Sequence, residues 1–193
     1  MKTVAALYID PKGPYPRMDG VDCWDELRDA RKYPGPYPVV AHPPCGPWGR
    51  LRFLCGPRLI EQQQLGIIAV EAVQQWGGVL ENPVDSALWN FCRLPRPNCL
   101  PDEFGGWSLF VRQVSWGHCC VKPTWIYIVG ADPDVVLRGI RHGGTPTHQI
   151  GIGGRRLLFA SSEKRRRTPP EFAEYLASIA RSVEKTSLRS RGD

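Results

Sequence analysis

The chain lacks both long hydrophobic runs and a paired cysteine framework. No stretch of about 18 consecutive apolar residues occurs, and Met1 is followed almost at once by a strand-like segment, so we expect neither a membrane span nor a signal peptide. The seven cysteines are an odd number without regular spacing, which favours free thiols in a reducing, cytoplasmic setting. These absences argue against a membrane protein and against a secreted domain stabilised by disulfides.

Acidic residues are outnumbered by basic ones, 19 to 25, and the excess gathers in the last third of the chain. Residues 164–167 read Lys-Arg-Arg-Arg, and Arg155 and Arg156 precede them. Such a cluster attracts polyanions because each neutralised phosphate releases condensed counterions. A solvated helix entry explains the same run equally well. The charge therefore permits nucleic acid or a free nucleotide as a partner without requiring either.

Apolar runs alternate with helical periodicity along the 193 residues, and no repeat or linker divides them. This alternation predicts a single α/β domain over residues 1–185, followed by a disordered tail at 186–193. Glycine-rich residues 142–154 are expected to form a loop or a small hairpin. The expected strands are residues 4–9, 39–41, 79–80, 109–114 and 125–129, and the expected helices are residues 59–76 and a final helix opened by Thr168.

Two reactive side chains directly follow two of the apolar runs. Cys45 ends a Pro-Pro-Cys turn, and Glu81 opens a Glu-Asn-Pro turn at the next strand. A thiolate can add to a heteroaromatic ring while a carboxylic acid protonates a ring nitrogen, so the pair predicts pyrimidine chemistry. A thiolate nucleophile needs a lowered pKa, for which His42 and Arg50 are nearby candidates. The alternatives are a buried packing thiol and a salt-bridged carboxylate.

Four segments resemble motifs of the DNA cytosine-5 methyltransferases, in the order of that family. Residues 39–45 are similar to its Pro-Cys nucleophile motif, and residues 78–83 to its Glu-Asn motif. Residues 116–130 resemble its aromatic-Gly stretch leading into a strand, and Thr168-Pro169-Pro170 resembles its closing motif. The resemblance implies a truncated, Rossmann-like fold of the S-adenosylmethionine-dependent methyltransferases with a mixed sheet.

The resemblance also implies a reaction, namely methyl or related alkyl transfer to carbon 5 of cytosine. Cys45 would attack carbon 6, and Glu81 would protonate ring nitrogen 3. Carboxylates near the first strand could hold S-adenosylmethionine, because ligands bind at the carboxyl ends of strands in open α/β sheets. The expected cofactor-binding residues are Asp10, Asp22 and Asp29, and the expected substrate-binding residues are Pro44, Trp48, Asn82, Lys122, Thr124, Arg165 and Arg166. Among these, Trp48 is expected to stack on a base and Asn82 to hold its turn through side-chain to backbone hydrogen bonds.

The chain also departs from the family pattern. The first strand is followed by residues 10–15 rather than by a Gly-x-Gly turn, and Gly46 replaces a glutamine after the nucleophile. Lys122 and Thr124 stand where the family has paired arginines. No target-recognition domain of normal size fits between Gly130 and Thr168, which points to a small phage or prophage relative. Residues 142–154 would then be a minimal DNA-reading loop.

Three other interpretations stay open. One is an amino-methyltransferase, whose Pro-Pro motif residues 42–45 imitate with a cysteine in place of the aromatic residue. Another is a catalytically silent protein that binds nucleic acid or nucleotides with the same base pocket. The cysteines could also bind metal, since His118, Cys119 and Cys120 are adjacent, with Cys92 and Cys99 upstream. Their spacing is unlike a zinc knuckle, so we expect scattered free thiols and no metal.

Overall fold

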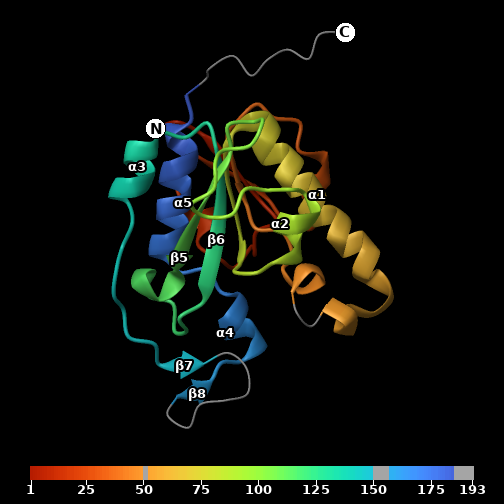
Figure 1. The fold of residues 1–193 in the computed structure, drawn as a ribbon, viewed down its shortest axis with the longest axis vertical. Coiled ribbons are helices and arrows are strands. Elements are labelled where there is room, and N and C mark those ends of the chain that lie inside the picture. The colour runs from red at the N-terminus through yellow and green to blue at the C-terminus, as the bar shows by residue number, and fades with distance from the viewer. Residues whose placement is uncertain (50–51, 150–156, 185–193) are drawn as a thin grey trace.

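A computed structural model describes residues 1–49, 52–149 and 157–184 of the chain. Its centre is a six-stranded mixed sheet with the strand order β2-β1-β3-β4-β6-β5 (Figure 1). The first four strands are parallel neighbours, whereas β6 runs antiparallel to both β4 and β5. The strands of this sheet are β1 (Val4–Leu7), β2 (Val21–Trp24), β3 (Val39–Ala41), β4 (Gly78–Pro83), β5 (Trp107–Arg112) and β6 (Pro123–Val129).

Helices and a small second sheet complete the described part of the chain. Strands β7 (His148–Gln149) and β8 (Leu158–Phe159) pair in parallel with each other, away from the main sheet (Figure 1). The α-helices are α1 (Leu59–Trp76), α2 (Ala87–Phe91), α3 (Pro133–Arg138), α4 (Ser162–Arg166) and α5 (Pro170–Ser182). The 3₁₀ helices are η1 (Tyr15–Arg17), η2 (Ala30–Lys32), η3 (Gly46–Trp48), η4 (Arg52–Arg58) and η5 (Gln113–Trp116). None of the helices in these ranges is long and apolar enough to cross a bilayer.

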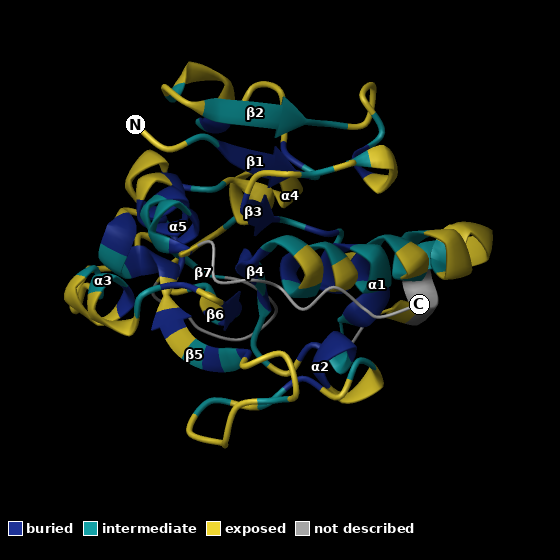
Figure 2. Ribbon diagram, turned by 90° about the horizontal axis from the view of Figure 1, so that it is seen from above, coloured by how far each residue is buried: buried dark blue, intermediate teal, exposed yellow. Residues whose placement is uncertain are grey.

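The main sheet is covered on both faces, which explains why its central strands are apolar throughout. Helix α5 packs on one face and α1 on the other, as Figure 2 shows in a view along the sheet. Successive side chains of a strand point to opposite faces, so Val4 and Ala6 belong to the core beneath α5, and Ala5 and Leu7 to the core beneath α1. The two cores fix which residues emerge on each side of the sheet.

Glycine at position 78 sets the register between the two strands that carry the predicted catalytic residues. Gly78 has a φ of +124°, and a Cβ there would lie 2.0 Å from the carbonyl oxygen of Val39. Only glycine therefore allows β4 to begin this close to β3. The resulting register pairs Val39 with Gly78 and Ala41 with Leu80. His42, which follows Ala41, and Glu81, which follows Leu80 within β4, are consequently neighbours.

The structure confirms the α/β architecture with a mixed sheet. The helix over residues 59–76 and the strand over 39–41 have the predicted bounds, and the strand predicted at 79–80 extends over β4. Strand β2 was not predicted, because its sequence Val-Asp-Cys-Trp is short, half polar and at the sheet edge. The final helix begins at Pro170 rather than next to Thr168, and no side chain caps it. The predicted tail and residues 150–154 of the predicted loop lie outside the described ranges.

Candidate active site

Cys45 and Glu81 lie toward the same edge of the sheet, Cys45 in the turn after β3 and Glu81 in the carboxyl-terminal half of β4. Strands β3 and β4 are parallel neighbours, so their carboxyl ends meet there, where open α/β sheets bind their ligands. The Pro-Pro turn after His42 then leads to Cys45, which directly precedes helix η3. Burial is the main cause of a raised pKa of the Cys45 thiol, and the negative charge of Glu81 raises this pKa further. The tertiary structure thus brings the two residues into one electrostatic environment.

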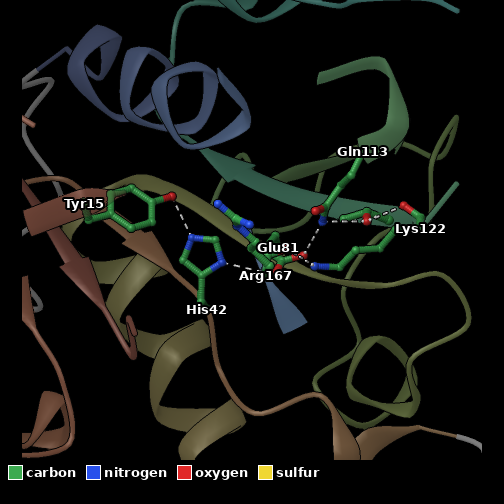
Figure 3. A network of polar contacts seen from close by, with 7 residues as sticks. Tyr15, His42, Glu81, Gln113, Lys122 and Arg167 are labelled. Carbon is green, nitrogen blue, oxygen red and sulfur yellow. Dashed lines mark hydrogen bonds and ion pairs between the residues drawn. The ribbon is translucent and has the colours of Figure 1, made fainter. Parts of the chain in front are cut away.

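Glu81 lies in a chain of hydrogen bonds from three different parts of the protein (Figure 3). His42 Nδ1 lies 3.1 Å from Glu81 Oε1, and Gln113 donates from Nε2 to Glu81 Oε2 across 3.3 Å. The hydroxyl oxygen of Tyr15 lies 2.7 Å from His42 Nε2. A carboxylate can only accept, so His42 donates from Nδ1, and Nε2 of the neutral ring accepts from Tyr15. This arrangement fixes the imidazole and leaves Glu81 firmly oriented.

The carboxyl of Glu81 is ionised at neutral pH. Burial raises its pKa, but the hydrogen bond from His42 and the positive charge of Lys122 outweigh burial, so the pKa lies below its usual value. Only 13% of the Glu81 side chain is exposed, which makes both effects strong. Glu81 therefore holds no proton in the resting protein, and it has to receive one before it can protonate a ring.

Cys45 is exposed but is not a preformed thiolate. Although its side chain reaches solvent, the surrounding protein displaces enough water for burial to be the main cause of a raised thiol pKa. Glu81 raises it further, whereas the charges of Lys122 and Arg166 lower it without reversing the shift. The expected depression of this pKa by nearby cations is therefore not found. His42 is engaged by Tyr15 and Glu81, and Arg50 lies outside the described residues.

The basic cluster of helix α4 lies at this site although it is more than 80 residues from Glu81 in sequence. Lys122 donates from Nζ to the backbone carbonyl of Arg167 across 3.3 Å, which joins the start of β6 to the end of α4. Arg166 acts on the thiol of Cys45, and residues 162–167 are exposed. Burial and Cys119 raise the pKa of Cys120, and the charges of Lys122 and Arg165 offset part of this rise. Cationic groups thus surround the exposed thiol.

Thr124 supports the site from within instead of facing it. Its side chain is 1% exposed, its hydroxyl donates to the carbonyl of Lys122 across 3.0 Å, and it accepts from Gln113 Nε2 across 3.0 Å. A substrate cannot reach a hydroxyl buried to this extent, so Thr124 positions Gln113 and Lys122. Gln113 Oε1 is buried without a hydrogen-bond partner in the part of the chain that the structure describes. This leaves an unsatisfied acceptor beside Glu81.

Two residues expected to bind substrate lie in the core. Trp48 is 3% exposed and packs against Phe91 with ring centroids 5.4 Å apart. A Cβ at Gly66 of helix α1 would lie 2.4 Å from the indole nitrogen of Trp48, so the ring is enclosed and cannot stack on a base.

Asn82 is 1% exposed, and neither polar atom of its side chain has a hydrogen-bond partner among the described residues. The predicted turn-holding bonds of Asn82 are therefore not formed, because strand alternation points its side chain away from Glu81 and into the opposite core. Pro44 is half-buried directly before Cys45.

The three carboxylates expected to hold a methyl donor are already engaged. Asp10 accepts from the amide of Lys12 across 2.9 Å. Asp22 accepts from Trp24 Nε1 and pairs with Arg28, and Asp29 pairs with Arg31 and also caps η2. These local bonds follow from sequence neighbours and leave no carboxylate poised for a ribose. Asp22 and Asp29 are therefore held by arginine neighbours, and these contacts do not indicate a preformed S-adenosylmethionine site.

Three residues of the hydrogen-bond chain around Glu81 were not predicted in these roles from the sequence, namely Tyr15, His42 and Gln113. Strand alternation could have placed His42 on the face of Glu81, since both follow residues of the opposite core. Tyr15 lies in a segment rich in proline and glycine, where the sequence has no periodicity that would indicate which way its side chain points. Gln113 begins the turn after β5, and polar residues at strand ends are too common to single it out. Its buried contact with Glu81 depends on the pairing of β4, β6 and β5.

These features define an α/β protein with a thiol and a hydrogen-bonded carboxylate at the carboxyl edge of a mixed sheet, flanked by cations. The chain matches no family model, and comparisons with curated proteins and with solved structures also give no match. Any functional assignment consequently depends on the residues and their geometry.

Proposed function

We propose that this protein attacks carbon 6 of a cytosine base with Cys45 and so prepares carbon 5 for methyl transfer. The observation that carries the proposal is the placement of Cys45 and Glu81 at one sheet edge, where the charge of Glu81 acts directly on the thiol. Addition of a thiol to an aromatic ring needs both a nucleophile and protonation of the ring. The two side chains supply these two functions.

The protonation states of the resting site give a balanced first step. Cys45 begins as a thiol with a raised pKa, and Glu81 begins as a carboxylate with a lowered one. In the addition, the thiol proton passes to Glu81 and from there to ring nitrogen 3, while sulfur bonds to carbon 6. No net charge enters the half-buried site, since the ring gains the proton that sulfur loses. The electron pair of the former double bond is then available at carbon 5.

The cations around Cys45 favour a phosphorylated substrate. Lys122 and Arg166 are near the thiol, and Lys164, Arg165 and Arg167 continue the same exposed surface. Phosphate contacts position a nucleotide without specifying its sequence. A base in a short single strand or a free nucleotide also avoids the few kcal/mol that flipping a base out of a duplex costs. We therefore expect cytidine nucleotides or single-stranded DNA to bind better than a duplex.

A catalytically silent binder of nucleotides is the second candidate. Two observations favour it, namely the raised pKa of the Cys45 thiol and the engagement of Asp10, Asp22 and Asp29 in local bonds. Such a protein would bind cytosine nucleotides through Glu81 and the basic surface without forming a covalent bond. The two candidates agree on binding and differ on chemistry at carbon 5.

Exchange of the hydrogen on carbon 5 of cytosine separates these candidates without any methyl donor. When sulfur is bonded to carbon 6, carbon 5 can take a deuteron from D₂O. Loss of the original proton and expulsion of the thiolate, with return of the nitrogen-3 proton, then regenerate cytosine. We expect deuterium at carbon 5 of deoxycytidine monophosphate or of a short single strand, measured by NMR or mass spectrometry.

Cys45→Ser is the informative variant, and Cys99→Ser is its control, because both cysteines are exposed. Exchange should be lost in the first variant and retained in the second. Both should keep their melting temperatures within about 4 °C of the wild type, equivalent to roughly 1 kcal/mol for a chain of this size. Nucleotide binding without exchange in the wild type would support the silent binder. Calorimetry with S-adenosylmethionine then shows whether the protein binds that donor.

A further inference from the structure

The turn between η5 and β6 is tightly held and carries three potential metal ligands in succession. Gly117 adopts a φ of +87°, and His118 donates its amide to the carbonyl of Gln113 across 3.2 Å. Val114 donates to Val121 across 3.4 Å, which closes the base of the turn. The intervening side chains are His118, Cys119 and Cys120, and their backbone is thereby fixed before any ligand binds.

The side chains of this turn have the spacing of a metal site. One ring nitrogen of His118 and the two sulfurs lie within 4.8 Å of one another. The two sulfurs are 3.8 Å apart. In a tetrahedral zinc site with Zn–S bonds of about 2.3 Å, two thiolate sulfurs lie roughly 3.8 Å apart. The thiols therefore need little movement, and the imidazole has to approach by at most about 1 Å.

The imidazole of His118 is the second observation that points to a ligand. The ring is 4% exposed, and Nε2 has no hydrogen-bond partner in the described ranges. Nδ1 accepts from the amide of Cys120 across 2.9 Å, and it lies 3.0 Å from the carbonyl oxygen of the same residue. A metal ion can bind Nε2 once the ring proton has moved to Nδ1, where this carbonyl can accept it, as behind metal-bound histidines. A buried polar atom without a partner is costly, and an ion would satisfy it.

We propose that His118, Cys119 and Cys120 bind one zinc ion with two thiolates, one imidazole and an open fourth position. Sulfur and imidazole ligands in tetrahedral geometry select zinc over the hard cations, which prefer oxygen. Binding replaces the two thiol protons, which pass to the solvent, so the site with its ion is neutral. This conclusion differs from the expectation of scattered free thiols. Cys92 and Cys99, which the sequence offered as further ligands, do not belong to the cluster.

The ion would stabilise the segment that leads to the basic surface. The carbonyl of Cys119 accepts from the amides of Thr147 and His148, across 3.0 and 2.9 Å. His148 begins β7, and its ring lies 2.9 Å from Lys164 Nζ of helix α4. An ion on Cys119 therefore holds the turn to which β7 and α4 are attached. The proposal does not depend on the activity of Cys45.

The test uses the full chain, reduced and freed of metal with a chelator, and titrated with Co²⁺ and then with Zn²⁺. We expect one Co²⁺ per chain, with the intense ultraviolet absorption of thiolate coordination and the visible bands of tetrahedral cobalt. Zinc should displace cobalt and raise the melting temperature, because an ion that binds the folded state selectively stabilises it.

Cys119→Ser and Cys120→Ser should each remove the thiolate absorption, while Cys99→Ser should retain it. Cys120 is buried and Cys119 is half-buried, so Cys119→Ser decides the matter if Cys120→Ser fails to fold. His118→Gln should reduce zinc affinity at least tenfold. Absence of the thiolate absorption in the wild type, or equal binding by the wild type and Cys119→Ser, would overturn the proposal.

Discussion

The imidazole of His42 donates to the carboxylate of Glu81 across 3.1 Å and accepts from the hydroxyl of Tyr15 through its other nitrogen. The side chains of His42 and Glu81 are only 10% and 13% exposed. Little water screens the contact between them, so it can affect whether Glu81 is charged. Burial, followed by the charge of Glu81, raises the pKa of Tyr15 and keeps its phenol protonated. The pair therefore sets the protonation state of the site, and the predictions below depend on it.

Replacing His42 should raise the pKa of Glu81. In His42→Leu the hydrogen bond from Nδ1 that lowers this pKa is removed, and burial, which raises it, remains. NMR of the side-chain carboxyl carbon as a function of pH measures the change directly. Tyr15→Phe is the matched comparison, since it keeps the His42 contact and should move the Glu81 pKa less. Equal Glu81 pKa values in the wild type and His42→Leu would contradict the role of this contact.

The same lowered pKa predicts how Glu81 contributes to stability. Because its pKa is lower in the folded state, its contribution is present above the unfolded carboxyl pKa of about 4.3 and is lost as pH falls through the folded pKa. The difference in unfolding free energy between wild type and Glu81→Gln should thus be largest near neutral pH and shrink in acid. Urea unfolding at several pH values tests this. A difference that grows as the pH falls would have the wrong sign.

Glu81→Gln should also slow carbon-5 exchange by roughly 10²–10⁴, the range supplied by general acid–base catalysis. An amide keeps the shape of the side chain but cannot carry a proton from sulfur to ring nitrogen 3, so nucleotide affinity should change much less than the rate. Glu171→Gln is a suitable control, because that carboxylate is exposed on α5 and pairs with Arg141. An unchanged rate in Glu81→Gln would leave this residue with a structural role.

Alkylation of Cys45 should report the charges around its thiol. The pKa of Cys45 is raised, so its reaction with iodoacetamide should reach half its maximal rate above pH 8.5, near which ordinary thiols titrate. Removing the negative charge in Glu81→Gln should shift this midpoint down, and removing the cation in Lys122→Met should shift it up. Mass spectrometry of the peptide containing Cys45 follows the rate. Shifts in the opposite directions would refute the electrostatic description of the site.

Neutralising the basic surface should weaken nucleic-acid binding and reduce its dependence on salt. Changing Lys164, Arg165, Arg166 and Arg167 to alanine should flatten the slope of log affinity against log salt by roughly 0.7–0.9 for each phosphate that is no longer neutralised. Sequence preference should be affected little, because phosphate contacts do not specify sequence. Fluorescence anisotropy with a single-stranded oligonucleotide measures the slope.

Arg93→Ala combined with Arg138→Ala provides a comparison that removes exposed positive charge elsewhere and should leave the slope unchanged. If the wild type binds no oligonucleotide at low salt, or if the quadruple variant keeps the wild-type slope, the basic surface is not a nucleic-acid interface. A free nucleotide would then be the favoured substrate.

The sequence by itself determined the elements that have a clear hydrophobic pattern. The apolar run of β3 and the three-and-four spacing of α1 were sufficient for their bounds, since burial on a sheet dictates both patterns. The sequence also predicted Cys45 and Glu81 at strand ends; Cys45 does lie in the turn after β3, whereas β4 continues beyond Glu81 to Pro83. Edge strand β2 was not predicted because its four residues are all only partly buried and its pattern is too short to distinguish it from a loop.

Only the tertiary structure decided what surrounds those two residues. Trp48 and Asn82 are close to Cys45 and Glu81 in sequence, yet they lie in the core, because strand alternation and the close approach of α1 at Gly66 direct their side chains inward. Tyr15 and the basic helix α4 are distant in sequence, yet they reach the site. The pKa of a side chain depends on its distances in space to other charged groups, and the strand order sets these distances. A linear pattern contains no such distances, so it could suggest the reactive pair but not its protonation state.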